Sequence, residues 1–508
     1  MLDFGGQYTH LIARRIRELG VRSDIVPGDA PASEVLSRRP GALVLSGGPR
    51  SVSEEGAPRA DPGVLESGLP ILGICYGHQL IAHQMGGSVR RSPRAEYGRT
   101  RIRVVGSSRI LDGLPREFSA WMSHGDVVES PPPGFSVTAV SESGLIAAME
   151  DPDRGGGVYS VQFHPEVVQT EHGREILRNF LFGVAGLRRD WNPTSMIPSM
   201  IEEVRGTVGP DGLALCAVSG GVDSMTAAAI AHRAIGDRLH VVFVDHGLLR
   251  EGEVEEVLRA LRSMGIRNLH FIDASARFLA ALRGVTDPEE KRLIIGRTFA
   301  EVFEEVASSI PGVRFLIQGT IYPDRIESGA SGRGSDRIKS HHNVAGLPEE
   351  FGLRVVEPLR DLYKDEVRQV ARELGLPESI VGRHPFPGPG LAVRIEGEVT
   401  EEKLSIARRA NAIVEEEFAR AGLYGEVWQA FAVVTEGRWV GVKGDRRELG
   451  RVVIVRAVTS EDGMTADWFR APHDLMASIS KRITEEIPGV VMVAYAVTSK
   501  PPSTIEAC

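Results

Sequence analysis

The sequence predicts an α/β protein with two open, mainly parallel sheets, followed by a smaller C-terminal α+β unit. Through the first two-thirds of the chain, short apolar runs end in Gly, Ser or a charged residue and are followed by helical patterns. This alternation is typical of parallel sheets that helices cover on both faces. With 508 residues, the chain is long enough for about three domains. The apolar runs are ALVLSGGP (42–49), LPILGICYG (69–77), LALCAVSGGVDS (213–224), HVVFVDHG (240–247) and RFLIQGT (314–320).

The composition is that of a globular protein, with 42% hydrophobic and 25% charged residues. Three cysteines are too few for a disulfide scaffold and fit a reducing compartment. The net charge is −9, no long run of Lys and Arg occurs, and no stretch approaches the roughly 20 apolar residues that span a bilayer. The opening MLDFGGQYTH also lacks the features of a targeting segment. We therefore expect a cytoplasmic protein that binds neither nucleic acid nor a membrane.

The first elements can be placed from their residue pattern. Only Met1 and Leu2 precede the turn-like segment DFGG, and we expect a strand that short to weaken the first sheet. An apolar helix face then runs from Leu11 to Leu19. Gly20 stands where a helix C-cap is expected.

Two Pro-containing segments divide the chain. DWNPTSMIP (190–198) suits a linker, and RHPFPGPGL (383–391) has too many prolines and glycines for regular structure. We predict three domains, at 1–189, 190–385 and 386–508. The third domain is predicted to be a small α+β unit with helices at 401–421 and 472–487, alternating apolar runs at 430–434, 438–442 and 451–458, and a strand at 490–497.

Cys75 is a candidate nucleophile. It ends the run LPILGIC, and Gly73 and Gly77 lie two residues away on either side. Glycines at these positions permit a sharp strand-to-helix turn that projects the side chain, and the helix dipole then favours a thiolate. Taken alone, the pattern fits a buried structural cysteine equally well. Cys216, inside the run LALCAV, is expected to be such a buried apolar residue.

Two further motifs offer the partners that a nucleophilic cysteine needs. FHPE (163–166) places His164 and Glu166 two residues apart, so both side chains lie on one face of an extended chain. A thiolate needs a base, and the base needs an orienting carboxylate. SGGP (46–49) can bring backbone N–H groups to an oxyanion, although a lone Gly pair is more often an ordinary turn.

Together these motifs resemble the class I glutamine amidotransferase family. The resemblance implies the class I amidotransferase fold and glutamine hydrolysis through a thioester, with release of ammonia. It makes Cys75 the nucleophile, and His164 and Glu166 complete a catalytic triad. The residues it implies for glutamine binding and the oxyanion are Gly48, Tyr76, Gln79, Ser123, Gly125 and Asp126.

A Gly-rich segment, SGGVDS (219–224), lies between a predicted strand and an Ala-rich helix. Backbone amides at a helix N-terminus form a cradle for anions. No G-K-[ST] follows, so it is not a Walker A loop, and a turn without chemistry is the plainer alternative. The segment resembles the pyrophosphate loop of N-type ATP pyrophosphatases, which implies an adenine-nucleotide α-hydrolase-like fold and Mg²⁺ at Asp223, held through the pyrophosphate. The implied ATP-binding residues are Ser219, Gly220, Gly221, Val222, Asp223, Ser224 and, after the next strand, Asp245.

Further motifs extend the resemblance over nearly the whole chain, to the GMP synthetase (glutamine-hydrolysing) family. This family implies that ATP adenylylates the 2-oxygen of xanthosine 5′-monophosphate (XMP) and that ammonia then displaces AMP, giving GMP, pyrophosphate and glutamate. The motifs are GTIYPDRIESG (319–329), IKSHHN (338–343), EPLRDLYKDEV (357–367), RHPFPGPGLAVRI (383–395) and SKPPSTIE (499–506).

The same resemblance implies partners and further site residues. The substrates are glutamine, ATP with Mg²⁺, and XMP, with no permanently bound cofactor. The third domain is expected to form a homodimer and to contribute C-terminal residues to the nucleotide site. The candidates for XMP contact or for the reacting site are Arg292, Asp324, Lys339, Lys500 and Glu506.

Several positions in the third domain depart from the family pattern. They put the detail of the XMP site in question, but not the class of reaction. The departures are Arg446, Leu449, Met492, Ala496 and the ending Ala507-Cys508.

Two alternatives remain open from the sequence. One is another ATP pyrophosphatase with a fused glutaminase, for example one that amidates a carboxylate, although IKSHHN and the Pro-Gly segment disfavour it. The other is a catalytically weak relative that binds nucleotides or regulates, which the altered C-terminal domain suggests. Measuring GMP, AMP and pyrophosphate from ATP, glutamine and XMP separates the three readings.

Overall fold

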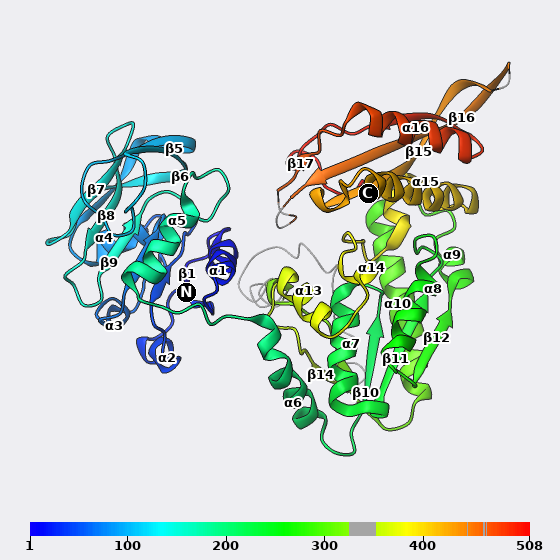
Figure 1. Cartoon of the computed structure of the whole chain (residues 1–508), viewed down its shortest axis with the longest axis horizontal. Helices are drawn as coiled ribbons and strands as arrows, with labels where there is room; N and C mark the ends of the chain where they lie inside the picture. Colours follow the sequence, from blue (N-terminus) through cyan, green and yellow to red (C-terminus); the bar gives the residue numbers. More distant parts are fainter. Residues whose placement is uncertain (325–351, 444, 461–462, 464, 508) are drawn as a thin grey trace. The chain divides into compact units, whose positions relative to one another are not determined.

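The computed structural model describes residues 1–324, 352–443, 445–460, 463 and 465–507, which form two compact units (Figure 1). The units are Met1–Asn192 and Pro193–Cys508, so their boundary lies inside the expected linker. Within the second unit, one hydrophobic core includes residues of both the second and the third predicted domain, such as Phe278 and Phe418. The division of this unit at residue 385 stays a prediction.

The first unit is built on a nine-stranded sheet in the order β2-β1-β3-β4-β9-β8-β7-β5-β6. The half from β2 to β9 is parallel, and the rest is antiparallel. The central strands are buried on both faces, as their unbroken apolar runs predict. The strands are β1 Leu2–Asp3, β2 Val26–Pro27, β3 Leu43–Leu45, β4 Ile71–Ile74, β5 Ser88–Val104, β6 Glu117–Ser130, β7 Ser136–Ser141, β8 Ile146–Asp151 and β9 Val158–Val161.

Helices cover the parallel half of this sheet (Figure 1). Helix α1, Thr9–Glu18, buries Ile12 and Ile16, and Gly20 follows it with φ 86°, as expected for a C-cap glycine. The other helices of the unit are α2 Ala32–Ser37, α3 Pro62–Leu65, α4 Tyr76–Gln84, α5 Gly173–Arg178 and a π-helical turn at Asn179–Val184.

Strand β1 is as short as the sequence predicts. Although it contains only two residues, it lies between β2 and β3 and pairs with both. A cavity of about 590 Å³ borders it, with Met1, Val26, Leu43 and Leu187 among its lining residues. The first sheet is therefore loosely filled at this point.

The second unit contains a five-stranded parallel sheet among the described residues, in the order β12-β11-β10-β13-β14. The strand order reverses between β10 and β13, and ligands of such sheets bind at the carboxyl ends of the strands beside this reversal. The strands are β10 Leu213–Val218, β11 Leu239–Asp245, β12 Leu269–Asp273, β13 Val313–Ile317 and β14 Arg354–Val356. The flanking helices are α6 Ile197–Val208, α7 Val222–Ile235, α8 Glu253–Ser263, α9 Ser275–Ala281, α10 Pro288–Ser309, α13 Lys364–Glu373 and α14 Glu378–Val381.

The C-terminal part of this unit packs helices against a second, smaller sheet (Figure 1). The alternating apolar runs at 430–434 and 438–442 both belong to one strand, β15, Gln429–Lys443. A break in the register between Val434 and Arg438 interrupts the alternation without ending the strand. The remaining elements are a 3₁₀ helix at Gly390–Arg394, α15 Glu401–Arg420, β16 Arg446–Thr459, β17 Asp467–Trp468, α16 His473–Glu486 and β18 Val490–Tyr495.

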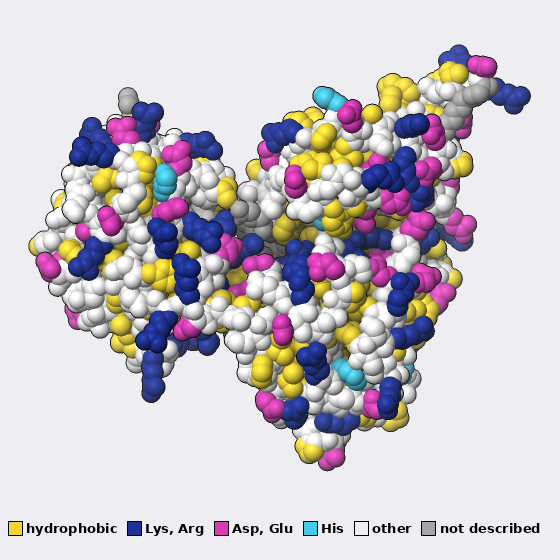
Figure 2. Space-filling model, viewed as in Figure 1, with side chains coloured by type: hydrophobic (Ala, Val, Ile, Leu, Met, Phe, Trp, Pro, Cys, Tyr) yellow, Lys and Arg dark blue, Asp and Glu magenta, His cyan; other side chains and the backbone are white. Residues whose placement is uncertain are grey.

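On the face drawn in Figure 2, Lys and Arg side chains are scattered among Asp and Glu side chains on both units. The β15–β16 hairpin forms a projecting arm with exposed apolar side chains, namely Trp439, Val440, Val442 and Leu449. None of the helices in the described ranges is both long and apolar enough to cross a membrane.

Candidate active sites

Cys75 occupies a strained turn between β4 and α4. Its φ of 54° and ψ of −103° lie outside the regions that non-glycine residues ordinarily adopt. The turn packs tightly, because a Cβ on Gly77 would lie 2.8 Å from Leu45 Cβ and one on Gly73 would lie 2.6 Å from Ile81 Cδ1. The two glycines thus allow close packing, and the turn holds the thiol at the N-terminus of α4.

His164 and Glu166 follow β9 and form a buried pair. His164 Nδ1 lies 2.7 Å from Glu166 Oε1, and the two side chains are 5% and 0% exposed. Burial opposes the charged imidazole, but Glu166 and Cys75 outweigh it and raise the pKa of His164 well above its ordinary value. Arg15 Nε donates to the Glu166 carbonyl at 3.0 Å and fixes this segment from α1. The arrangement is that of an imidazole held between a cysteine and an orienting carboxylate.

The SGGP segment (46–49) lies against Cys75 and His164. A Cβ on Gly47 would be 3.4 Å from His164 Cε1 and 3.8 Å from Cys75 Cβ. A Cβ on Gly48 would be 3.1 Å from Tyr76 Cγ, so the two residues implied for the oxyanion site are neighbours. Glycine leaves the space beside the thiol open and lets backbone N–H groups approach a reacting oxygen.

The residues implied for glutamine binding lie on α4 and β6. Gln79 donates through Nε2 to the Asp126 carbonyl at 2.9 Å. Cys75 Sγ lies 3.8 Å from the Ser123 carbonyl, so the segment that contains Gly125 reaches from the nucleophile to Gln79. The structure therefore brings these residues together at the amino end of α4.

Sequence reasoning missed three polar residues beside this group. Gln79 Nε2 also lies 3.2 Å from Gln162 Oε1. Glu96 on β5 pairs with His124 on β6 at 3.3 Å between Oε2 and Nε2. These contacts join residues on different strands, and the sequence does not show which strands are neighbours. Only the position of His124 inside the MSHGD segment (122–126) marked one of the three as a candidate site residue.

The Gly-rich segment joins β10 to α7 at the reversal of strand order. Gly220 has φ 80°, and Gly221 is the N-cap residue of the 14-residue helix. Ser224 Oγ accepts from the Ser219 N–H at 3.2 Å and donates to the Gly221 carbonyl at 3.1 Å, which closes the loop. The free N–H groups of the first helical turn then point toward the mouth of the loop, where they can bind an anion.

Asp223 lies at the start of α7 beside a lysine. Lys364, from the N-terminal end of α13, pairs with Asp223 Oδ2. Asp223 Oδ1 is buried and has no hydrogen-bond partner within the described residues. A Cβ on Gly319, after β13, would lie 2.9 Å from the Ser224 nitrogen, so the two loops are in contact.

Asp245 ends the neighbouring strand β11. Its Oδ1 accepts from the Gly247 N–H at 2.8 Å, which holds the turn after the strand. The side chain stands at the carboxyl edge of the same sheet, one strand from the Gly-rich loop. This placement suits contact with a nucleotide bound across the loop.

Glu506 is anchored by residues that sequence reasoning did not assign. Arg394 binds both of its carboxylate oxygens at 3.1 Å each, and Gln429 Nε2 donates to Oε1 at 2.8 Å. Lys500 Nζ donates to the Gly463 carbonyl at 2.8 Å. The C-terminal segment is thus folded back onto the second sheet.

The remaining XMP candidates lie on other elements. Arg292 is on α10, with Nε 3.5 Å from Glu289 Oε1. Asp324 follows β13 and accepts from the Ile321 N–H at 3.2 Å. Lys339 and the IKSHHN motif lie outside the described residues, as does Cys508.

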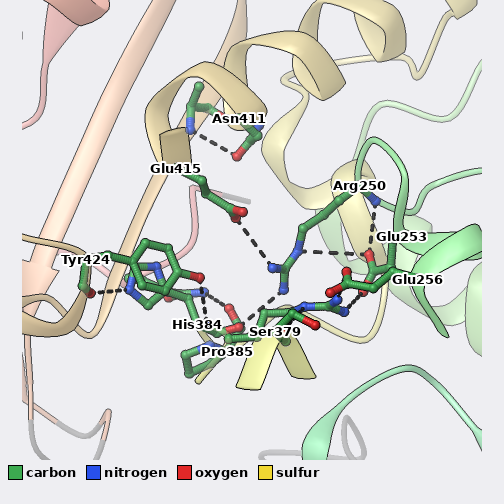
Figure 3. Close-up of polar contacts among 12 residues, drawn as sticks. Arg250, Glu253, Glu256, Ser379, His384, Pro385, Asn411, Glu415 and Tyr424 are labelled. Atoms are coloured by element: carbon green, nitrogen blue, oxygen red, sulfur yellow. Dashed lines mark hydrogen bonds and ion pairs between the residues drawn. The ribbon is translucent and has the colours of Figure 1, made fainter. Parts of the chain in front are cut away.

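A network of charged residues borders the Gly-rich loop (Figure 3). Arg383 donates to Glu253 at 2.8 Å and also pairs with Glu256. The Arg250 N–H donates to the other oxygen of Glu253 at 3.1 Å. A Cβ on Gly220 would lie 3.5 Å from Glu253 Oε1, so this network abuts the loop and supports its shape.

Comparisons with known proteins agree with these observations. The family model "Glutamine amidotransferase class-I" matches residues 1–184, and "GMP synthase C terminal domain" matches residues 416–507. Three relatives are each described as "GMP synthase [glutamine-hydrolyzing]". The chain is 55% identical to that of Pyrobaculum aerophilum, 54% to that of Carboxydothermus hydrogenoformans and 53% to that of Aquifex aeolicus. Each comparison covers 100% of this chain and 98–99% of the relative.

Proposed function

The chain belongs to the glutamine-hydrolysing GMP synthase family, and we propose that its two sites make GMP from XMP with ammonia taken from glutamine. The proposal rests on the presence of two groups of site residues in one chain. One is Cys75 with the His164–Glu166 pair, and the other is the Gly-rich loop at the reversal of strand order.

The first site hydrolyses glutamine. The Cys75 thiolate attacks the carboxamide carbon, and the oxyanion that forms is stabilised by N–H groups near Gly48 and Tyr76. His164 gives its proton to the leaving ammonia, while Glu166 stabilises the imidazolium. Water, activated by the neutral His164, then opens the thioester to glutamate.

The second site activates XMP with ATP. The 2-oxygen of XMP attacks the α-phosphorus, pyrophosphate leaves, and ammonia then displaces AMP at the base. The amides of the Gly-rich loop bind the pyrophosphate part of ATP. Mg²⁺ fits beside Asp223, because Oδ1 is a buried carboxylate oxygen without a partner among the described residues and Mg²⁺ prefers carboxylate and phosphate oxygens. Bound there, Mg²⁺ neutralises the charge on the pyrophosphate group.

The XMP contacts are proposed for Arg292, Lys500 and Glu506. Arg394 and Gln429 support them by holding Glu506 in place. Asp324 and Lys339 are proposed near the reacting atoms. The departures Leu449 and Met492 are placed on β16 and β18, and they leave the Arg394–Glu506 pair intact.

The C-terminal part is proposed to form a homodimer. Its projecting arm exposes Trp439 (56%), Val442 (70%) and Leu449 (58%). Large apolar side chains are rarely grouped in this way on the surface of a monomer. A Trp439→Ser/Leu449→Ser double variant is expected to sediment at half the mass of the parent. Sedimentation of the parent itself as a monomer would refute the dimer.

One assay tests the whole reaction. Protein with ATP, Mg²⁺, XMP and either glutamine or an ammonium salt is expected to give GMP, AMP and pyrophosphate in equal amounts. Cys75→Ala is expected to abolish synthesis from glutamine and to keep synthesis from ammonium. If neither nitrogen source yields GMP with the parent protein, the proposal is wrong. If Cys75→Ala loses both activities while folded, the division of labour between the two sites is wrong.

A further inference from the structure

We propose that the buried contact between Glu96 and His124 positions the glutamine pocket and thereby sets the affinity of the first site for glutamine. Neither residue is placed in the triad or the oxyanion site. The inference rests on the glutaminase function proposed above, because it concerns the same pocket.

The two residues face each other across neighbouring strands. Glu96 on β5 is the register partner of His124 on β6. Glu96 Oε2 and His124 Nε2 are 3.3 Å apart, and the side chains are only 7% and 2% exposed. The hydroxyl of Ser141, on β7, donates to the other Glu96 oxygen at 2.8 Å. Three adjacent strands therefore hold the pair in one geometry.

The two ring nitrogens of His124 contact different partners. His124 Nδ1 lies 2.9 Å from the Asp126 carbonyl oxygen, which can only accept, so Nδ1 carries a hydrogen. Nε2 faces the Glu96 carboxylate on the neighbouring strand. Burial would raise the pKa of Glu96, but its contacts with His124 and Ser141 outweigh burial and lower that pKa. The imidazole is therefore held between a carboxylate and a backbone carbonyl.

A second buried histidine lies near this pair. Burial lowers the pKa of His78 to about 3. His78 Nδ1 lies 2.9 Å from the Ser160 hydroxyl. Ser160 therefore anchors the ring of His78, whereas Glu96 faces the ring of His124.

The pair reaches glutamine through one peptide group. The Asp126 carbonyl accepts from both His124 Nδ1 and Gln79 Nε2, each at 2.9 Å. Since the second Nε2 hydrogen faces Gln162 Oε1 at 3.2 Å, both amide hydrogens of Gln79 are engaged. Gln79 Oε1 is then presented as an acceptor, which suits the N–H groups of a bound glutamine. The His124 ring fixes the 123–126 segment, and that segment fixes the orientation of Gln79.

Stability alone does not explain a pair of this kind. Burying a carboxylate and an imidazole together is often no more stabilising than burying well-packed apolar residues of similar volume, because both groups lose their hydration. A peptide group positioned beside Cys75, in contrast, requires a donor held in one orientation, and the His124 ring supplies it.

The test compares Glu96→Gln with Glu117→Gln. Gln at 96 keeps the size of the side chain but removes the carboxylate that faces His124. Glu117 lies on the same β5–β6 ribbon, is 54% exposed and pairs loosely with Arg101 at 3.8 Å, so its variant is the matched control. We expect Glu96→Gln to raise KM for glutamine at least tenfold and to change kcat less than threefold. Glu117→Gln is expected to leave both unchanged.

Two further readouts separate positioning from loss of structure. Alkylation of Cys75 by iodoacetamide does not use the glutamine pocket, so its rate is expected to be unchanged in Glu96→Gln. Synthesis of GMP from ammonium is expected to be unchanged as well. An unchanged KM overturns the inference, and so does a parallel fall of kcat, alkylation rate and melting temperature. If Glu96→Gln does not fold, Ser141→Ala takes its place, and an unaltered KM in that variant counts against the inference in the same way.

The two proposals fail in distinguishable ways. A parent protein without glutamine hydrolysis contradicts the proposed function itself. If the parent is active and Glu96→Gln has the same KM for glutamine, only the inference about the contact between Glu96 and His124 is contradicted.

Discussion

The Nδ1 atom of His164 lies 2.7 Å from Oε1 of Glu166, and this buried contact orients the imidazole toward Cys75. The carboxylate also raises the pKa of His164 against the effect of burial. The imidazolium therefore persists to higher pH than it would without Glu166.

Replacing Glu166 by Gln removes this support while keeping the size of the side chain. We expect kcat for glutamine hydrolysis to fall by about 10²- to 10⁴-fold, as when the carboxylate of a triad is neutralised. The pKa of His164 falls, so the alkaline limb of the pH–rate profile moves to lower pH. Synthesis from ammonium serves as the internal control. An alkaline limb that stays in place would show that Glu166 does not set the charge of His164.

Gly77→Ala is expected to destabilise the first unit. The new Cβ would lie 2.8 Å from Leu45 Cβ on β3, so the turn that holds Cys75 must shift. Overpacking of this kind costs about 1–3 kcal/mol. Thermal inactivation of the glutaminase measures the effect, and Gly183→Ala is the control because nothing lies within 4 Å of a Cβ there. Equal thermal stability of the two variants would argue against a tightly packed turn.

The motifs predicted most of the fold and the local parts of both sites, because each is encoded within a few consecutive residues. The strand before Cys75, the FHPE pair and the loop after β10 are of this kind. The partners that support them come from distant segments: Glu96 across a strand pair, Arg394 before α15, and Lys364 at the start of α13. No spacing rule in the sequence links these residues to their sites. The sequence pattern divides β15 into two apolar runs for a related reason, since a shift of register between Val434 and Arg438 interrupts the alternation.

Asp223→Asn is expected to abolish GMP synthesis from ammonium and to leave glutamine hydrolysis in place. The amide keeps the size of the side chain but removes the charge that Mg²⁺ requires at Oδ1. Lys364→Met, which removes the partner of Oδ2, is expected to raise KM for MgATP. Lys481→Met, at an exposed position of α16, is the matched control. Full synthesis by Asp223→Asn would rule out a metal contact at this residue.

Arg456→Met is expected to weaken XMP binding without touching the first unit. The guanidinium is buried and donates to the carbonyls of Thr498, Thr504 and Ile505, at 3.0, 2.8 and 2.9 Å. Hydrogen bonds that involve a charged group contribute about 1.5–3 kcal/mol each, so their loss loosens the segment that carries Glu506. We expect KM for XMP to rise at least tenfold while glutamine hydrolysis is unchanged. Arg470→Met, at an exposed position, is the control, and equal KM values for the two variants would contradict the prediction.

The pH dependence of stability in the second unit is expected to come from two buried histidines. Burial lowers the pKa of both His246 and His384 from 6.5 to about 4. The structure uses the neutral forms: His246 Nδ1 accepts from the Leu248 N–H at 3.0 Å, and His384 Nε2 lies 2.8 Å from the Tyr424 carbonyl. The unfolded chain binds these protons at higher pH than the folded chain does. Stability is therefore complete above about pH 6.5 and is lost as the pH falls toward 4.

Each histidine accounts for a loss of up to about 3 kcal/mol across this interval, at roughly 1.4 kcal/mol per pKa unit. Urea unfolding of the second unit between pH 4 and 7 measures the slope. His384→Gln keeps a donor toward the Tyr424 carbonyl but has no group that titrates here, so we expect it to flatten the slope by about half. His473→Gln, at an exposed position, is expected to leave the slope as it is. A slope that is the same in the parent and in His384→Gln would mean that the acid sensitivity arises from other groups.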